Sequence, residues 1–185
     1  EDLKLRIDTL SPAESNARHT QLIADALAHL RRIGDLTGLA ADPDLDAYYL
    51  TGALLDRLPW AAEYLGQIAA HGASAAARRS IGAEDSAQLR TLVRQAASTM
   101  EFMDRSFESA FRQNEDLRGK LEGPVSSAMN AGGYLRNLAQ RELIDRGEIA
   151  SSPRAFLDSG SAALDKLFKV HEIAAVHVRA LLERR

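Results

Sequence analysis

His171 and His177 are the residues of this chain whose types and spacing come nearest to a metal site. A helical zinc-protease motif places two histidines four residues apart, so that both lie on one face of the helix. Here the separation is six residues, which puts the two imidazoles about 120° apart around a helix and prevents them from sharing one ion. A ferritin-like di-iron site needs Glu-x-x-His pairs, and the glutamates near histidines are wrongly spaced for one. The sequence therefore predicts no metal site.

Motifs for covalent catalysis or phosphate binding do not stand out either. The chain has no cysteine, which excludes thiolate catalysis, disulfides and cysteine-type zinc sites. No Ser-His-Asp spacing and no pair of isolated inward carboxylates can be recognised. Gly132 and Gly133 lie in an alanine-rich helical stretch rather than after a strand, where they would let two helices approach closely. We expect that the protein is not an enzyme and uses no cofactor.

Arg57 is a candidate for binding a small anion. It lies among apolar residues, namely Leu54, Leu55, Leu58 and Trp60. An arginine in such a setting either extends its guanidinium to solvent or to an ion pair, or presents it to a carboxylate ligand across a helix interface. Both interpretations stay open at this stage.

Aromatic side chains and histidines complete the set of candidate ligand-binding residues, which are Trp60, His171, Tyr48, Tyr49 and His19 in addition to Arg57. His171 falls on the predicted inner seam of its helix, where a neutral imidazole either hydrogen-bonds within the core or contacts a ligand. If the helices are equally long and antiparallel, a small pocket forms at the level of His171. Its lining would consist of Arg57, Trp60, Met100, Asn130 and His171.

The adjacent residues Tyr48 and Tyr49 point in different directions on any helix. One of them must face the bundle, and the other turns toward its flank or a neighbouring subunit. Core packing with the hydroxyl at the surface is the simpler interpretation of the inward one.

Composition is that of one globular domain, which we assign to residues 1–185. Apolar residues make up 45% of the 185 residues and charged residues 26%, and no segment repeats at a fixed period. A net charge of -3 and only 5% aromatic residues argue against nucleic-acid binding. No run of about 18 apolar residues suggests a membrane span. The chain begins and ends inside helical patterns, which is typical either of a piece excised from a longer protein or of frayed termini.

Apolar residues recur at helical spacing between glycine and proline breaks, which predicts an all-α, elongated antiparallel bundle of four to six helices of about 30 residues. The expected helices are 12–38, 43–71, 84–113, 116–146 and 153–183, with 1–10 as the end of a sixth. Ser11 with Glu14 forms a capping box, and Asp42-Pro43 and Ser152-Pro153 are further helix starts. Pro59 bends or interrupts its helix, and Pro124 introduces a kink.

Two apolar seams define the inward faces most clearly, because their residues alternate steps of four and three. The first consists of Leu89, Val93, Ala96, Met100, Met103, Phe107 and Ala110. The second consists of Leu157, Gly160, Leu164, Leu167, His171, Ala174, Val178 and Leu181. A single helix from 84 to 146 would be about 93 Å long, so a reversal is expected between 112 and 124.

The stretch Asp42-Pro43-Asp44-Leu45-Asp46-Ala47-Tyr48-Tyr49-Leu50 combines a helix start with a recognisable signature. With His19-Thr20-Gln21-Leu22-Ile23 before it and Leu54-Leu55-Asp56-Arg57-Leu58-Pro59 after it, this stretch resembles an extracytoplasmic all-helical sensor domain. Such domains occur in bacterial chemotaxis receptors, sensor histidine kinases and diguanylate cyclases. The resemblance covers essentially the whole chain.

That resemblance implies reception of a signal on the periplasmic side of a bacterial inner membrane. A small-molecule ligand, such as an anion, would alter helix packing, and flanking transmembrane helices outside this chain would carry the movement to an output domain. The full receptor would pair as a homodimer. The alternative is a structural or protein-interaction bundle without a small ligand. A polar cavity near Arg57 and His171 would favour the sensor, and a dry continuous seam would favour the alternative.

Overall fold

The computed structural model describes residues 9–38, 44–145 and 148–183. Within these ranges the regular structure is helical throughout and contains no strand. The elements are α2 (Pro12–Leu36), α3 (Leu45–Gly52), the π-helical segment η3 (Ala53–Arg57), α4 (Leu58–Arg78), α5 (Ala83–Gln113), α6 (Glu115–Ala139), the π-helical segment η4 (Gln140–Asp145) and α7 (Pro153–Leu182). The predicted all-α bundle is confirmed.

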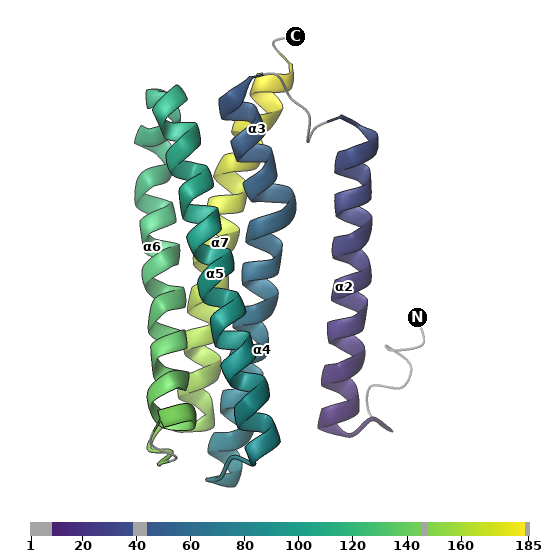
Figure 1. Cartoon of the computed structure of the whole chain (residues 1–185), viewed down its shortest axis with the longest axis vertical. Helices are drawn as coiled ribbons and strands as arrows, with labels where there is room; N and C mark the ends of the chain where they lie inside the picture. Colours follow the sequence, from purple (N-terminus) through teal and green to yellow (C-terminus); the bar gives the residue numbers. More distant parts are fainter. Residues whose placement is uncertain (1–8, 39–43, 146–147, 184–185) are drawn as a thin grey trace.

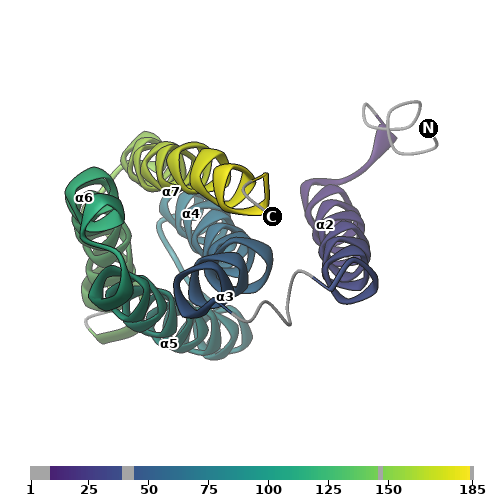
Figure 2. The same cartoon turned by 90° about the horizontal axis from the view of Figure 1, so that it is seen from above.

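Four long helical units form a closed ring, and α2 stands beside it (Figures 1 and 2). Each unit runs antiparallel to the one before it in the chain (Figure 1). The ring consists of the continuous unit α3–η3–α4, followed by α5, α6 and α7. Seen from above, α2 lies outside the ring, next to the unit that contains α3 and α4 (Figure 2).

Side-chain caps start three of the helices, and those at Ser11 and Ser152 were predicted from the sequence. The Ser11 hydroxyl accepts a hydrogen bond from the backbone amide of Glu14, and the Glu14 carboxylate accepts one from the amide of Ser11, which completes the capping box. Asn114 reverses the chain between α5 and α6, and its side-chain oxygen accepts from the amide of Leu117 at 3.1 Å. Ser152 caps α7 in the same way. The expected reversal is therefore at Asn114.

The second predicted helix, 43–71, differs from the observed one at both ends. Asp42 and Pro43 lie outside the described residues, and Asp44 occupies the N-cap position of α3. At the other end the helix does not stop at 71, because α4 continues to Arg78. The residues after Gly72 are mostly alanines, which favour helix more than any other residue type. Pro59 is the second residue of α4, which begins directly after η3.

The first predicted seam forms the core. The second is right at Gly160, Leu167 and Ala174, which are buried, and wrong at Leu157 and His171, which are exposed. Leu89, Ala96, Met100, Met103, Phe107 and Ala110 are buried, and Val93 packs against them. On α7 the buried residues are Phe156, Gly160, Ala163, Leu167, Val170 and Ala174. His171, whose inward orientation was predicted, is exposed. Phe156 and Val170 each precede a predicted seam residue by one position. Because these two side chains are buried, their neighbours Leu157 and His171 point to solvent.

Glycines allow the helices of the ring to approach one another closely. A Cβ atom on Gly72 would overlap the ring of Phe156, and one on Gly160 would overlap the Cβ of Ala69. A Cβ on Gly132 would lie 2.5 Å from Cε of Met100. The predicted role of Gly132 in close helix packing is thus confirmed. The interior of the ring has no room for an added methyl group at these positions.

Candidate functional site

The helix α2 is held to the ring mainly at one end. Gly34 is buried there, and a Cβ at this position would lie 2.7 Å from Cδ1 of Leu55. Nearby, the guanidinium of Arg31 pairs with the carboxylate of Asp56 in η3. Two hollows lie along the interface, a smaller one beside the Arg31–Asp56 pair and a larger one toward the beginning of α2. They are lined by residues from α2, from the unit η3–α4 and from α5.

The smaller hollow, of about 300 Å³, contains two of the predicted site residues, Arg57 and Trp60. Its other lining residues are Arg31, Asp56, Tyr64 and Thr99. Asp56 pairs with both arginines, and its Oδ2 lies 3.2 Å from Nη1 of Arg57. The hollow therefore has two guanidinium groups and one carboxylate, and it carries one positive charge in excess.

Aromatic rings form one wall of this smaller hollow. Trp60 and Tyr64 stack with ring centroids 5.6 Å apart and planes inclined by 29°. Burial raises the pKa of the Tyr64 hydroxyl, and the charges of Asp56 and Glu63 add to that effect. The hydroxyl therefore stays protonated, and it can donate a hydrogen bond. The Arg57 guanidinium lies 5.3 Å from the ring centroid of Phe102, which holds it at the edge of the hollow.

The larger hollow is a groove of about 1110 Å³ between the beginning of α2, the end of α4 and the beginning of α5. Most of its lining residues are polar. They are Ser11, Ser15, Asn16, Ala17, His19 and Thr20 at α2, Gln67, Ala70, His71, Ser74 and Arg78 on α4, and Asp85 and Gln88 on α5. Hydroxyls, amides and imidazoles of this kind favour a polar occupant over an apolar one.

His71 is the least satisfied polar residue of the groove. Its Nε2 atom is buried and has no hydrogen-bond partner among the described residues. Burial lowers the pKa of the imidazole, with a smaller contribution in the same direction from Arg78, while Asp85 acts in the opposite direction. A neutral imidazole has one donor and one acceptor nitrogen. The unpartnered Nε2 is shielded from the groove, so an occupant would meet other atoms of the His71 ring.

The structure divides the predicted site residues among different places. Arg57 and Trp60 share the smaller hollow, and His19 lines the groove. His171 and Asn130 are exposed and line neither hollow, and Met100 is fully buried. The single pocket predicted at the level of His171 is therefore wrong in composition.

The tyrosine pair is arranged as the sequence predicts. Tyr49 packs against the core, and Tyr48 is 46% exposed on the flank of α3. Their rings meet edge to face with centroids 5.3 Å apart. Neither tyrosine lines either hollow.

Sequence reasoning missed most of the residues that α4 contributes to the two hollows. These residues are Tyr64, Gln67, His71, Ser74 and Arg78, and they follow Trp60 in alternating steps of four and three. This spacing defines one face of a helix, as an apolar seam does. The residues that carry this spacing are polar, whereas an inward helix face is recognised in a sequence by apolar residues. The contribution of Arg31 depends on packing between α2 and η3, for which we found no local signal.

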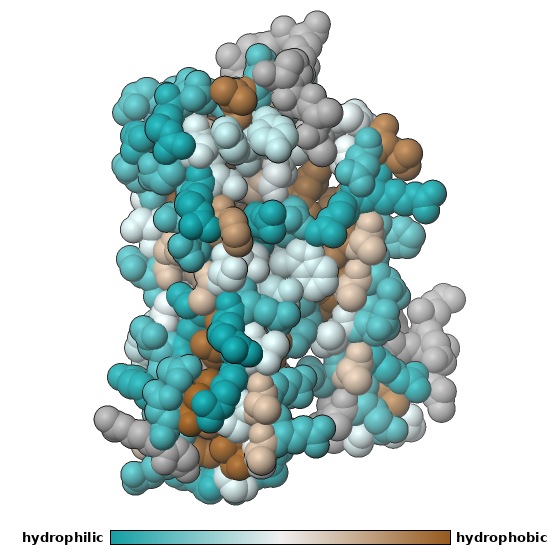
Figure 3. Space-filling view, in the orientation of Figure 1, coloured by the Kyte–Doolittle hydropathy of each residue, from teal (hydrophilic) through white to brown (hydrophobic). Residues whose placement is uncertain are grey.

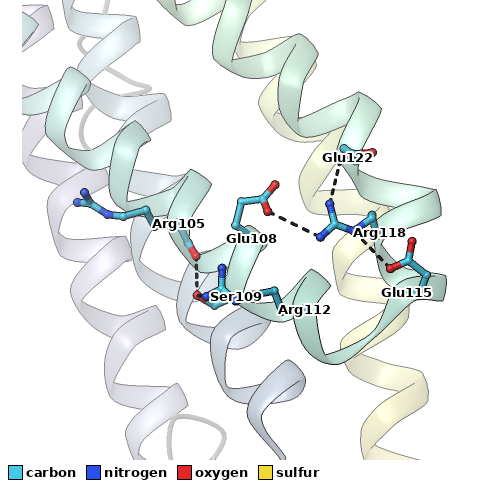
Figure 4. A network of polar contacts seen from close by, with 7 residues as sticks. All are labelled: Arg105, Glu108, Ser109, Arg112, Glu115, Arg118 and Glu122. Atoms are coloured by element: carbon cyan, nitrogen blue, oxygen red, sulfur yellow. Dashed lines mark hydrogen bonds and ion pairs between the residues drawn. The ribbon is translucent and has the colours of Figure 1, made fainter.

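A separate cluster of charges lies at the turn between α5 and α6 (Figure 4). Arg118 pairs with Glu108, Glu115 and Glu122 at 3.9, 3.5 and 3.1 Å, and its guanidinium lies 5.6 Å from the ring centroid of Phe111. These partners satisfy the arginine and tie α6 to α5. We interpret the cluster as structural.

The described part of the chain contains no group of metal-ligating side chains and no helix long and apolar enough to cross a membrane. No family model, curated protein or solved structure matched this chain.

Proposed function

We propose that this protein is the extracytoplasmic signal-sensing domain of a bacterial transmembrane receptor and that it binds a small molecule between α2 and the ring. The observation that carries this proposal is the separation of α2 from the ring by two polar hollows, together with its attachment near Gly34. The resemblance of the Asp42–Leu50 stretch to such sensor domains supports the same function.

The smaller hollow suits a small anion. Arg31 comes from α2, whereas Arg57 and Asp56 come from η3, so an anion held by both arginines bridges the two parts. The excess positive charge favours a carboxylate or a similar anion, and the stacked Trp60 and Tyr64 favour one with a flat apolar body. Binding would then shift the population toward a closer position of α2.

In the intact receptor, we propose, transmembrane helices outside this chain transmit that movement from the periplasm to an output domain. Packed helices suit this purpose because they switch between discrete arrangements. Pairing of two receptors would be supplied largely by the membrane and output parts, so the isolated domain is expected to dimerise only weakly.

A protein-interaction bundle is the alternative. Large apolar residues are exposed on α2, among them Leu22, Ile33 and Leu36. On the face shown in Figure 3, however, apolar side chains form small groups among hydrophilic ones. A continuous apolar patch, as expected of a protein interface, is not visible on that face.

A thermal-shift screen with nitrate, small carboxylates and aromatic acids tests the sensor proposal. A ligand at 100 times its Kd adds about 2.7 kcal/mol of stability, which raises the Tm of a domain of this size by about 5–10 °C. Arg57→Ala should abolish the shift and leave the unliganded fold intact, because this side chain is 45% exposed. Arg94→Ala, on the exposed surface of α5, is the matched control.

The outcomes separate the two functions. Equal shifts in the parent and in Arg57→Ala would remove Arg57 from the site. If no anion shifts the parent protein, the interaction bundle becomes the better explanation of the smaller hollow.

A further inference from the structure

The charged residues of the larger groove are a single ion pair. Among its lining residues only Arg78 and Asp85 carry full charges, and Nη2 of Arg78 lies 2.9 Å from Oδ2 of Asp85. The rest of the lining is neutral when the histidines are neutral. A buried ligand with net charge would therefore meet no uncompensated partner in the groove, in contrast to the excess positive charge of the smaller hollow.

Both members of this pair keep unused hydrogen-bonding capacity. A guanidinium has five N–H donors. Two bonds of Arg78 are found among the described residues, from Nη2 to Asp85 and from Nη1 to the hydroxyl of Ser74 at 2.6 Å. The contact with Ser74 also fixes the orientation of the guanidinium. The carboxylate of Asp85 accepts through Oδ2, and no bond to its Oδ1 is found among the described residues. A cation and an anion thus stand side by side at the groove wall, each with a free position.

We propose that the groove binds a free α-amino acid with an uncharged polar side chain, its carboxylate on Arg78 and its ammonium on Asp85. An α-amino acid carries both charges on one carbon, which matches two partners that are in contact with each other. Its side chain would meet the neutral polar groups of α4 and α5, among them Gln67, Gln88 and the exposed part of the His71 ring. This site is separate from the anion hollow, and it does not depend on the sensor function.

The proposed amino-acid site predicts how well the protein distinguishes glutamine from analogues that lack one of its two charged groups. The parent protein should bind glutamine more tightly than N-acetylglutamine, which lacks the ammonium group, and more tightly than glutamine amide, which lacks the carboxylate. Asp85→Asn should remove the discrimination against N-acetylglutamine, because the partner of the ammonium is gone. Arg78→Gln should remove the discrimination against glutamine amide. A surface that merely collects polar solutes would not show this crossed pattern.

Isothermal titration calorimetry with glutamine, asparagine, serine and threonine is the direct test. At least one of the four should bind, and Arg78→Gln and Asp85→Asn should each weaken it about tenfold or more, as expected for a lost charge-assisted hydrogen bond. Arg94→Gln removes an arginine from α5 outside both hollows and should leave the affinity unchanged. Arg57→Ala, which tests the anion hollow, should also have no effect here.

Circular dichroism of each variant shows whether the helical fold is retained, which both substitutions should allow because the two side chains are 51% and 43% exposed. The proposal is overturned if none of the four amino acids binds at about 10 mM. It is equally overturned if the two analogues bind as tightly as glutamine, or if Arg94→Gln weakens binding as much as Arg78→Gln does. The sensor proposal survives these outcomes, because its own test uses anions and Arg57.

Discussion

The interior of the four-helix ring is apolar and closely packed, whereas the interface between the ring and α2 is mostly polar and contains two hollows. Inside the ring, apolar side chains meet glycines so closely that no methyl group can be added at Gly72 or Gly160. At the α2 interface, polar residues surround two hollows, and a buried glycine contact occurs only near one end. The difference teaches that one chain can pack four helices tightly and leave a fifth in looser, more polar contact with them.

Replacing Phe156 in the ring interior should cause the largest loss of stability. Its ring is fully buried and fills the space that Gly72 leaves. Phe156→Ala should destabilise the protein by about 3–5 kcal/mol, because a cavity replaces the ring. Phe168→Ala, on the same helix but 55% exposed, should cost much less. Chemical denaturation measures both, and similar losses in the two variants would show that the ring interior is not packed as described.

Added methyl groups at two glycines should have effects of opposite sign. A Cβ on Gly160 meets the Cβ of Ala69, which is fixed to its backbone, and Gly160→Ala should cost about 1–3 kcal/mol. A Cβ on Gly34 meets only the far end of the flexible Leu55 side chain. Alanine also favours helix over glycine by about 1 kcal/mol, so Gly34→Ala should be neutral or stabilising. A large loss of Tm in Gly34→Ala would mean that α2 is docked as tightly as the ring helices.

His71, which lines the groove at the α2 interface, should have a smaller, pH-dependent effect on the stability of the protein. Burial lowers the pKa of this imidazole in the folded protein below the value of 6.5 that it has when exposed. The unfolded chain therefore binds the proton first, and stability should fall as the pH drops below 6.5 until the lower folded-state pKa is passed. Asp85 opposes this shift, Arg78 adds to it, and His19 lines the same groove.

The measurement for His71 is the Tm at about pH 5 and about pH 7.5. His71→Gln should reduce the difference between the two values, and the exposed His29→Gln is the control. An unchanged difference in His71→Gln would show that other groups govern the acid response.

Local signals in the sequence were sufficient for most of the fold. The capping box at Ser11, the helix start at Ser152-Pro153 and the seam from Leu89 to Ala110 each depend on residues close in the chain, and all three are confirmed. The predicted helix end at residue 71 was wrong because glycine, here Gly72, can mark either a helix end or a close contact between helices. Here it makes room for Phe156, which lies on a distant helix.

The candidate site was harder to predict because it depends on the phase and position of whole helices. On α7 the buried position is Val170 and not its neighbour His171, so the imidazole lies at the surface. Arg57 and Trp60 could be recognised as candidates in the sequence because an arginine and a tryptophan stand out among leucines. Their partner Arg31 lies on α2, and its place beside Asp56 depends on how two separate helices dock.

The π-helical turn before Pro59 also fixes the angular position of α3. In this turn the amide of Leu58 donates to the carbonyl of Ala53, five residues earlier, so the turn holds one residue more than an α-helical one. Deleting one residue there would rotate α3 by about 100° relative to α4. Asp46, whose carboxylate accepts a hydrogen bond from Asn114 at 2.9 Å, would lose that partner at the turn between α5 and α6. Related chains with and without this residue would therefore form two rotational classes, in which different side chains of α3 face that turn.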